Sequence, residues 1–289
     1  MKHDDENTQD ISESMGLFEA ALRPDEITLE SPRIETVLVA VDGSNQTATT
    51  EALGRAAADI LEARIVSMDA PPQDQDARET VQGILAEADR HGAGLLVVDA
   101  PFGEDIGALE MQSLGSVVDI LLEESSLPLL IARHELGDAK ATLRNPVLVV
   151  DWSPRLQGPP AAMAAALAHA GGEVLMIAVP EPVVLEGIRR LLGDEEGKRL
   201  TDELVSRAEV RLSGSLVAAM NKLADQEGFR VRFQVRSGSS LVNAVTDEMG
   251  TTERVLIVGH GDHDGGHGLQ HVRELILASR GPVLAVKAS

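Results

Sequence analysis

The amino-acid sequence predicts an α/β protein built from two repeated, doubly wound parallel sheets. Short apolar runs alternate with amphipathic helical patterns, which is typical of parallel strands joined by right-handed crossovers. Hydrophobic residues make up 43% of the chain, with four Phe, one Trp and no Tyr, so the core must be aliphatic. An apolar strand followed by Asp-x-Ser occurs at 36–44 and again at 146–153, which indicates an internal repeat.

The first repeat alternates strand and helix in order. A buried strand is expected at 36–41, a second, short strand at 64–68 and a third at the end of 92–98. Helices are expected at 46–62, where apolar residues have helical spacing, and at 76–91, where the pattern is amphipathic. An irregular stretch follows at 99–113. At 114–133, LGSVVDILLEESSLPLLIAR, a turn feeds a helix with one apolar and one acidic face, Pro128 stops that helix, and a short strand closes the repeat.

The second repeat has the same pattern but is longer. Strands are expected at 146–150, 173–179, 230–235, 254–258 and 282–287, with helices at 159–170, 195–228, 239–249 and 269–279 and a Gly- and His-rich loop at 259–268. The excess falls after the second strand. The first copy therefore lacks a long helix and one strand, and an edge strand is the piece that a sheet can lose without opening its centre.

These patterns divide the chain into three parts. Residues 1–33 are acidic and polar, and we expect a mostly disordered tail, with a partner-docking segment as the alternative. Residues 34–134 form the first, shortened domain and 145–289 the second. A polar linker at 134–145 joins them.

Charge and composition exclude several classes of function. The formal net charge is −22, a field that repels nucleic acids and anionic membrane surfaces. The chain has no cysteine, no apolar run near the ~20 residues of a membrane span, and a polar start unlike a signal peptide. We therefore expect a cytoplasmic protein.

Several residues are candidates for ligand binding. Gly115-Ser116 opens a helix, where backbone N–H groups and the helix dipole suit an anion, although simple helix entry with Ser as the cap is the alternative. Asp42 and Asp151 each follow a buried strand, where ligand contact and turn or helix capping are both open. No serine nucleophile elbow, P-loop lysine or paired-carboxylate acid/base site is present in the sequence pattern, so no catalytic residue is predicted.

A histidine-rich loop is the most unusual local feature. It brings imidazole and carboxylate groups together, a set that suits Zn or Ni: His260, His263, His267 and His271, with Asp262 and Asp264. A glycine-rich loop whose polar side chains are solvated explains the same residues without a metal. Metal binding by this loop is therefore an alternative rather than the main prediction.

The repeated motifs resemble those of a tandem universal stress protein. The resemblance covers nearly everything from Ile34 onward, and its motifs are VLVAVDGS (37–44), the 114–133 segment, VLVVDWS (147–153) and the segment 235–262. It implies Rossmann-like domains, similar to adenine-nucleotide alpha hydrolases, related by a pseudo-twofold axis. It also implies pairing of the last strands, 128–133 beside 282–287, as an internal pseudo-dimer, with a further homodimer left open.

The resemblance also implies an adenine-nucleotide site, with ATP and Mg, at the switch point of the sheet. Asp42 and Asp151 match the adenosine-side aspartate of the family. Gly115 and Ser116 match the end of its G-x2-G-x9-G-[ST] phosphate loop, and Gly259, with Gly261 near the second position, matches its start in the second copy. Asp99 replaces the first glycine in the first copy, Gly103 and Gly107 are out of register, and Leu269-Gln270 replace the final Gly-Ser in the second copy.

The sequence therefore predicts a non-enzymatic stress-response or regulatory protein with degraded nucleotide-binding loops. Two alternatives stay open: an ATP-binding stress sensor with slow hydrolysis, and a metal-binding module that uses the 260–271 loop. Partners would be a small-molecule nucleotide at most, with no nucleic acid and no membrane.

Overall fold

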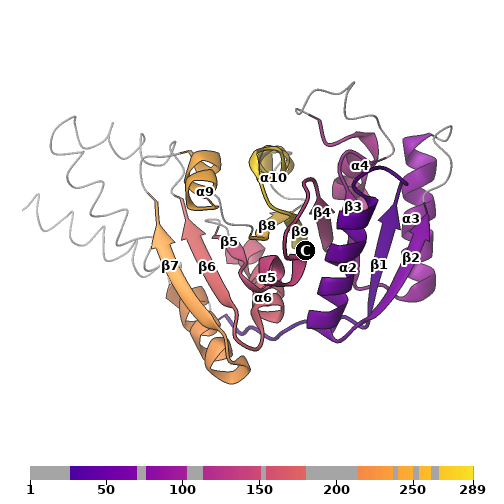
Figure 1. Ribbon diagram of the computed structural model, residues 1–289. Coiled ribbons are helices and arrows are strands. Elements are labelled where there is room, and N and C mark those ends of the chain that lie inside the picture. The colour runs from indigo at the N-terminus through magenta and orange to yellow at the C-terminus, as the bar shows by residue number, and fades with distance from the viewer. Residues whose placement is uncertain are drawn as a thin grey trace, which may run out of the picture.

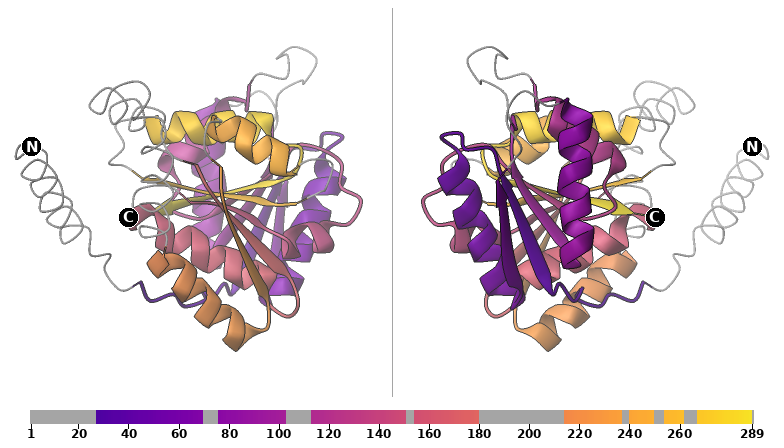
Figure 2. Two further views of the ribbon diagram at one scale, coloured as in Figure 1. Left: turned by 90° about the vertical axis from the view of Figure 1, so that its left-hand side faces the viewer. Right: turned by 90° about the vertical axis from the view of Figure 1, so that its right-hand side faces the viewer.

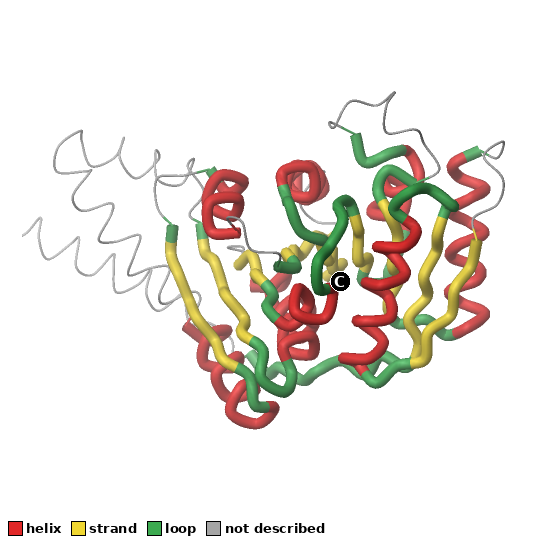
Figure 3. Tube along the Cα trace, viewed as in Figure 1, coloured by secondary structure: helices red, strands yellow, loops and turns green. Residues whose placement is uncertain are grey.

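The structure is a computed structural model that describes residues 27–69, 76–102, 113–150, 154–179, 214–236, 240–249, 254–261 and 267–288. Side chains of residues 154–156 and 267–268 lie outside this description. The described residues form one nine-stranded sheet with helices on both of its faces (Figures 1 and 3). The expected α/β class is therefore confirmed.

The first half follows the expected alternation of strand and helix. Asp76 caps the second of its helices, where its side chain accepts a hydrogen bond from the Arg78 N–H. The elements are β1 (Thr36–Val41), α2 (Thr47–Leu61), β2 (Arg64–Asp69), α3 (Ala77–His91), β3 (Leu95–Asp99), α4 (Ser116–Glu124) and β4 (Leu129–Ala132).

The second half repeats the alternation with more elements. A long helix is expected over 195–228. Its C-terminal part is confirmed, because residues 214–227 are helical, and the part before residue 214 lies outside the described residues. The other elements are α5 (Ala139–Arg144), β5 (Val147–Val150), α6 (Pro154–Ala168), β6 (Glu173–Ala178), β7 (Arg230–Val235), α9 (Leu241–Met249), β8 (Leu256–Gly261), α10 (His267–Ala278) and β9 (Val283–Ala288).

The strand order is the same in both halves when each is read outward from the junction between them. The full order is β2-β1-β3-β4-β9-β8-β5-β6-β7, parallel within each half and antiparallel where β4 meets β9. Leu130 pairs with Leu284 at this junction, as expected for strands 128–133 and 282–287. On the outside, β7 pairs with β6, whereas β2 has no strand beyond it among the described residues.

Each face of the sheet is buried under helices (Figure 2). Helices α2, α5, α6 and 214–227 pack on one face, and α3, α4, α9 and α10 pack on the other. Strands β1 and β3 are buried at every position because both of their faces are covered, which explains their continuous apolar sequences. The edge strands β2 and β7 alternate with exposed positions instead.

Polar contacts also join the two halves beside the β4–β9 junction. Arg273 of α10 forms ion pairs with Asp119 (2.7 Å) and Glu123 (2.8 Å) of α4. Arg133, which follows β4, is 9% exposed and donates from Nη1 to the carbonyl oxygens of Ile276 (2.9 Å) and Leu277 (3.0 Å). The C-terminal turn of α10 is thus capped by a side chain from the other half.

Three segments differ from the expected pattern. Residues 27–33, assigned to the tail by composition, include Ile27 and Leu29 packed on the core and Ser31 hydrogen-bonded to Glu227 (2.7 Å). The 134–145 linker contains the short helix α5, because Asp138 caps it with a bond from the Ala141 N–H (2.9 Å). Strand β8 extends into the expected loop, to Gly261, because its partner β9 continues to Ala288.

Candidate functional site

Asp42 lies directly after β1, at the carboxyl edge of the sheet in the first half. Its Oδ1 accepts a hydrogen bond from the backbone N–H of Ser44 (2.8 Å), and Gly43 allows the turn between them with φ of +76°. The cap position of α2 is Gln46, with no side-chain hydrogen bond to the helix. Asp42 therefore stabilises the turn rather than the helix start, and its half-buried carboxyl remains at the sheet edge.

Asp99 lies at the end of the neighbouring strand β3 and is fully buried. Its Oδ2 accepts a hydrogen bond from the Ser44 hydroxyl (3.1 Å), which in turn accepts one from the Gln46 N–H (3.2 Å). The Asp42 carboxyl is within hydrogen-bonding reach of Asp99. Ser44 thus connects the two acids, since its N–H binds one and its hydroxyl binds the other.

The environment of Asp99 strongly favours its neutral form. Burial, and then the negative charge of Asp42, raise the pKa of Asp99 to about 7. Hydrogen bonds from the backbone and from Ser44 lower the pKa of Asp99, but they offset only part of this increase. In the described part of the chain no ion pair links Asp99 to a basic side chain. The two acids therefore form a carboxyl pair that retains a proton near neutral pH.

Gly115 and Ser116 lie at the start of α4. Gly115 caps the helix with φ of +82° and ψ of 151°, a conformation that disfavours any residue with a Cβ, and its N–H donates to the Ser113 hydroxyl (3.1 Å). A Cβ on Gly115 would also come within 3.1 Å of the Pro101 Cβ. The expected cap residue Ser116 is instead the exposed first residue of the helix.

The first-half candidates therefore share one edge of the sheet. Pro101 and Phe102 follow Asp99 by only two and three residues, are buried, and contact the backbone at the start of α4. Asp42, Asp99 and the α4 N-terminus are thus brought together. The sequence identified Asp99 as the residue that replaces the first glycine of the phosphate loop, and it predicted no carboxylate pair. The signal that could have revealed it was the expected adjacency of the two strands that end at Asp42 and Asp99.

The second-half candidates are described only in part. Asp151 lies outside the described residues. Gly259 and Gly261, expected in a loop, lie in β8 opposite Val286 and Ala288 of β9. The loop prediction was wrong for these two glycines, because the ladder to β9 continues past them. Whether they approach a ligand stays a prediction.

The histidine-rich loop is also only partly described. His260 is 4% exposed in β8 and His271 is exposed on α10, whereas His263 and the side chain of His267 lie outside the description. Among the described residues no group of three or more His, Asp or Glu gathers as a metal site. The metal alternative for this loop stays a prediction.

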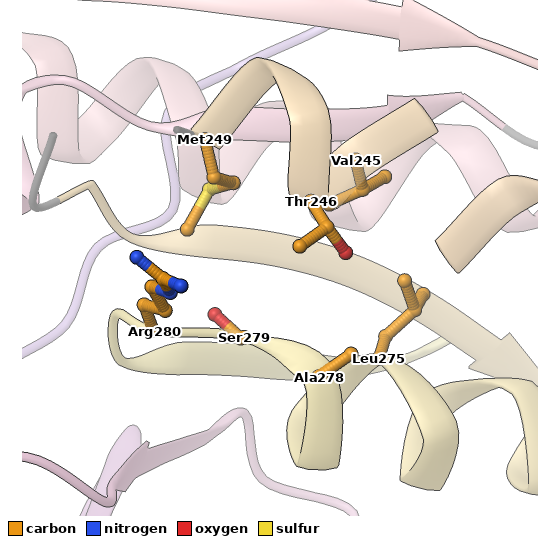
Figure 4. A pocket seen from close by; sticks show the side chains of 7 residues that line it. All are labelled: Val245, Thr246, Met249, Leu275, Ala278, Ser279 and Arg280. Carbon is orange, nitrogen blue, oxygen red and sulfur yellow. The ribbon is translucent and has the colours of Figure 1, made fainter. Parts of the chain in front are cut away.

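A small pocket lies between α9 and α10, and none of the candidate site residues lines it (Figure 4). Its lining is mostly apolar: Val245, Thr246, Met249, Leu275, Ala278, Ser279 and Arg280. Its volume of about 10 Å³ holds no more than one water molecule. It is a packing defect between two helices, so the carboxyl edge of β1 and β3 is the better candidate site.

No family model matches the chain, and no curated protein matches it by sequence. Solved structures do resemble it. A universal stress protein from Archaeoglobus fulgidus is 16% identical over 88% of this chain and 96% of its own, with a TM-score of 0.52. The fold is also similar to that of a functionally unknown protein from Pseudomonas aeruginosa PAO1, which is 14% identical over 88% of this chain and 93% of its own, with a TM-score of 0.56. A putative universal stress protein from P. aeruginosa UCBPP-PA14 is 13% identical over 88% of this chain and 93% of its own, with a TM-score of 0.53.

At these identities the comparison establishes the fold class. The chain has the α/β fold seen in universal stress proteins, with a mostly parallel sheet alternating with helices. No helix in the described ranges is both long and apolar enough to span a membrane.

Proposed function

We propose that the chain is a tandem universal stress protein, a non-enzymatic regulator in the cytoplasmic stress response. Its two halves would be copies related by a pseudo-twofold axis and associated as an internal dimer. The proposal is supported by the shared strand order about the β4–β9 junction and by resemblance to universal stress proteins over nearly their whole length. A homodimer of the tandem chain would use other surfaces.

The observation that carries the non-nucleotide part of this proposal is the Asp42–Asp99 pair. Asp99 occupies the position where the family's phosphate loop would begin, and it is buried beside a second carboxyl with no basic partner in the described chain. A triphosphate would meet like charge in a low-dielectric setting. Pro101 Cβ and the Phe102 backbone N also lie close to Gly115 at the start of α4, the position that matches the end of the family's phosphate loop. The first-half site thus suits a ligand other than a nucleotide.

Such a ligand would act by biasing the protein between conformational or assembly states. A ligand shifts such an equilibrium only by its difference in affinity for the two states. Native mass spectrometry of freshly purified protein would identify a small molecule that co-purifies with it.

Calorimetry with Mg-ATP tests the non-nucleotide proposal directly. For the wild-type chain, with MgCl2 alone as the reference titration, we expect ATP to add no saturable heat in the micromolar range. Micromolar binding that is lost in Asp42→Ala or in Asp151→Ala, but kept in the exposed-acid control Asp89→Ala, would contradict the proposal and assign a nucleotide to the corresponding half.

An ATP-binding sensor with slow hydrolysis and Mg²⁺ is the second candidate. It is favoured by the half-buried Asp42 at the end of β1 and by the Gly115-Ser116 helix start at the same edge, with Ser116 exposed. The same calorimetry decides between the two candidates. Elemental analysis of untagged protein tests the remaining alternative, a metal held by the 260–271 loop.

A further inference from the structure

The Asp42–Asp99 site collects oxygen acceptors that lack donors. Asp99 Oδ1 is buried and no described group donates a hydrogen bond to it. Gln46 Oε1 is also buried without a partner, and the same side chain is held at the site by a bond from Nε2 to the carbonyl oxygen of Ala100 (3.5 Å), the residue after Asp99. Buried acceptors without donors are costly, so this arrangement favours a bound group that interacts with oxygen atoms, such as a cation.

Arg133 follows the residue that pairs with Asp99 on the neighbouring strand, but its guanidinium binds another part of the protein. Asp99 pairs with Ala132 across the β3–β4 ladder, and Arg133 follows Ala132. The Arg133 guanidinium donates to the carbonyl oxygens of Ile276 and Leu277 at the end of α10 instead. The described part of the chain therefore supplies no basic side chain to Asp99, so the pair is neutralised either by the proton that it retains or by a bound cation that displaces this proton.

We propose that Asp42 and Asp99 hold a hard divalent cation, of the Mg²⁺, Mn²⁺ or Ca²⁺ class, without any nucleotide. One carboxylate would come from the end of each of two adjacent strands, and water would complete the coordination. Such ions prefer oxygen ligands, and Mg²⁺ in particular is commonly held by one or two carboxylates with several waters. This inference rests on the proposed function, because it names the ligand class of the first-half site.

The experiment is a titration of the untagged full chain with MnCl2 after chelator treatment and dialysis, with free Mn²⁺ measured by electron paramagnetic resonance. About 0.2 M KCl screens weak binding to the acidic surface. We expect one saturable site below about 1 mM, displaced by Mg²⁺ or Ca²⁺. Affinity should fall at least about tenfold in Asp99→Asn and in Asp42→Asn, and stay unchanged in Asp89→Asn, an exposed acid on α3 with the same change of charge.

A spectroscopic measurement on the wild-type chain tests the inference even if the variants do not fold. Pulsed resonance of bound Mn²⁺ should show oxygen ligands and no coupling to ¹⁴N. A ¹⁴N coupling would move the ion to the histidine loop and overturn the inference, as would the absence of a saturable site or full affinity in folded Asp99→Asn. If no Mn²⁺ binds but another small molecule co-purifies, the cation inference fails and the proposed function stands. If Mg-ATP binds and depends on Asp42, the proposed function fails instead.

Discussion

Replacing Asp99 by Asn removes the group whose ionisation the fold opposes most strongly. Burial and the charge of Asp42 raise the pKa of this carboxyl from 3.8 to about 7. Each pKa unit corresponds to about 1.4 kcal/mol, so keeping an ionised Asp99 in the folded state costs up to about 4 kcal/mol. That is a large part of the stability of an ordinary domain.

The sign of the effect follows from which state binds the proton more tightly. Below the ordinary pKa near 3.8, Asp99 is protonated in both states and imposes no cost. As the pH rises toward 7, the unfolded chain releases the proton while the folded chain keeps it, so the free energy of unfolding falls. Above the folded-state pKa the loss is complete. An asparagine side chain cannot ionise, so the Asp99→Asn variant lacks this contribution to the pH dependence.

Urea unfolding followed by circular dichroism, in the presence of a chelator, measures the difference. We expect Asp99→Asn to gain stability relative to wild type between about pH 4 and pH 7, by up to about 4 kcal/mol, and the difference to level off above about pH 8. Asp89→Asn, an exposed acid on α3, should run parallel to wild type. Parallel curves for Asp99→Asn as well would refute the argument, because they would mean that Asp99 ionises as freely in the fold as in the open chain.

Other substitutions test separate parts of the structure. Gly115→Ala should lower stability by about 1–3 kcal/mol, because φ of +82° and the nearby Pro101 both disfavour a Cβ; thermal unfolding checks this, and an unchanged melting temperature would contradict it. Arg133→Met should cost about 1.5–3 kcal/mol, because it removes charged hydrogen bonds to the end of α10, and denaturant unfolding should show the loss. A double-mutant cycle between Arg273 and Asp119 should give a coupling of only about 0.2–1 kcal/mol, because both side chains are about one-third exposed; a much larger value would mean that water is excluded there.

Much of the fold could be predicted because its signals are local. The β1 and β3 strands are buried at every position and apolar apart from Thr36 and Asp99, which is how fully buried parallel strands appear in a sequence. The 134–145 segment is polar, so its short helix was missed: α5 is six residues long and depends on the Asp138 cap rather than on an apolar stripe. The extension of β8 to Gly261 was missed because glycine lowers strand propensity, whereas pairing with β9 decides the outcome.

The candidate site was harder to predict because it is assembled across the sheet. Asp42 and Asp99 are 57 positions apart in the printed sequence, and only the β1–β3 pairing brings them together. Ser44 was noted as part of a repeated turn, but its hydroxyl bond to Asp99 depends on the depth at which that carboxyl is buried. Burial also determines the protonation of Asp99, and sequence pattern alone carries no measure of it.

The antiparallel ladder between β4 and β9 affects which strands are available for pairing with another copy of the chain. Each of these strands has a neighbour on both sides, β3 and β9 for β4, and β4 and β8 for β9, although the β4–β9 ladder covers only the first three residues of β9. The last strand of the first half thus pairs with the last strand of the second half within one chain. Strand pairing with another molecule is therefore open to the outer strand β2, which has no strand beyond it among the described residues.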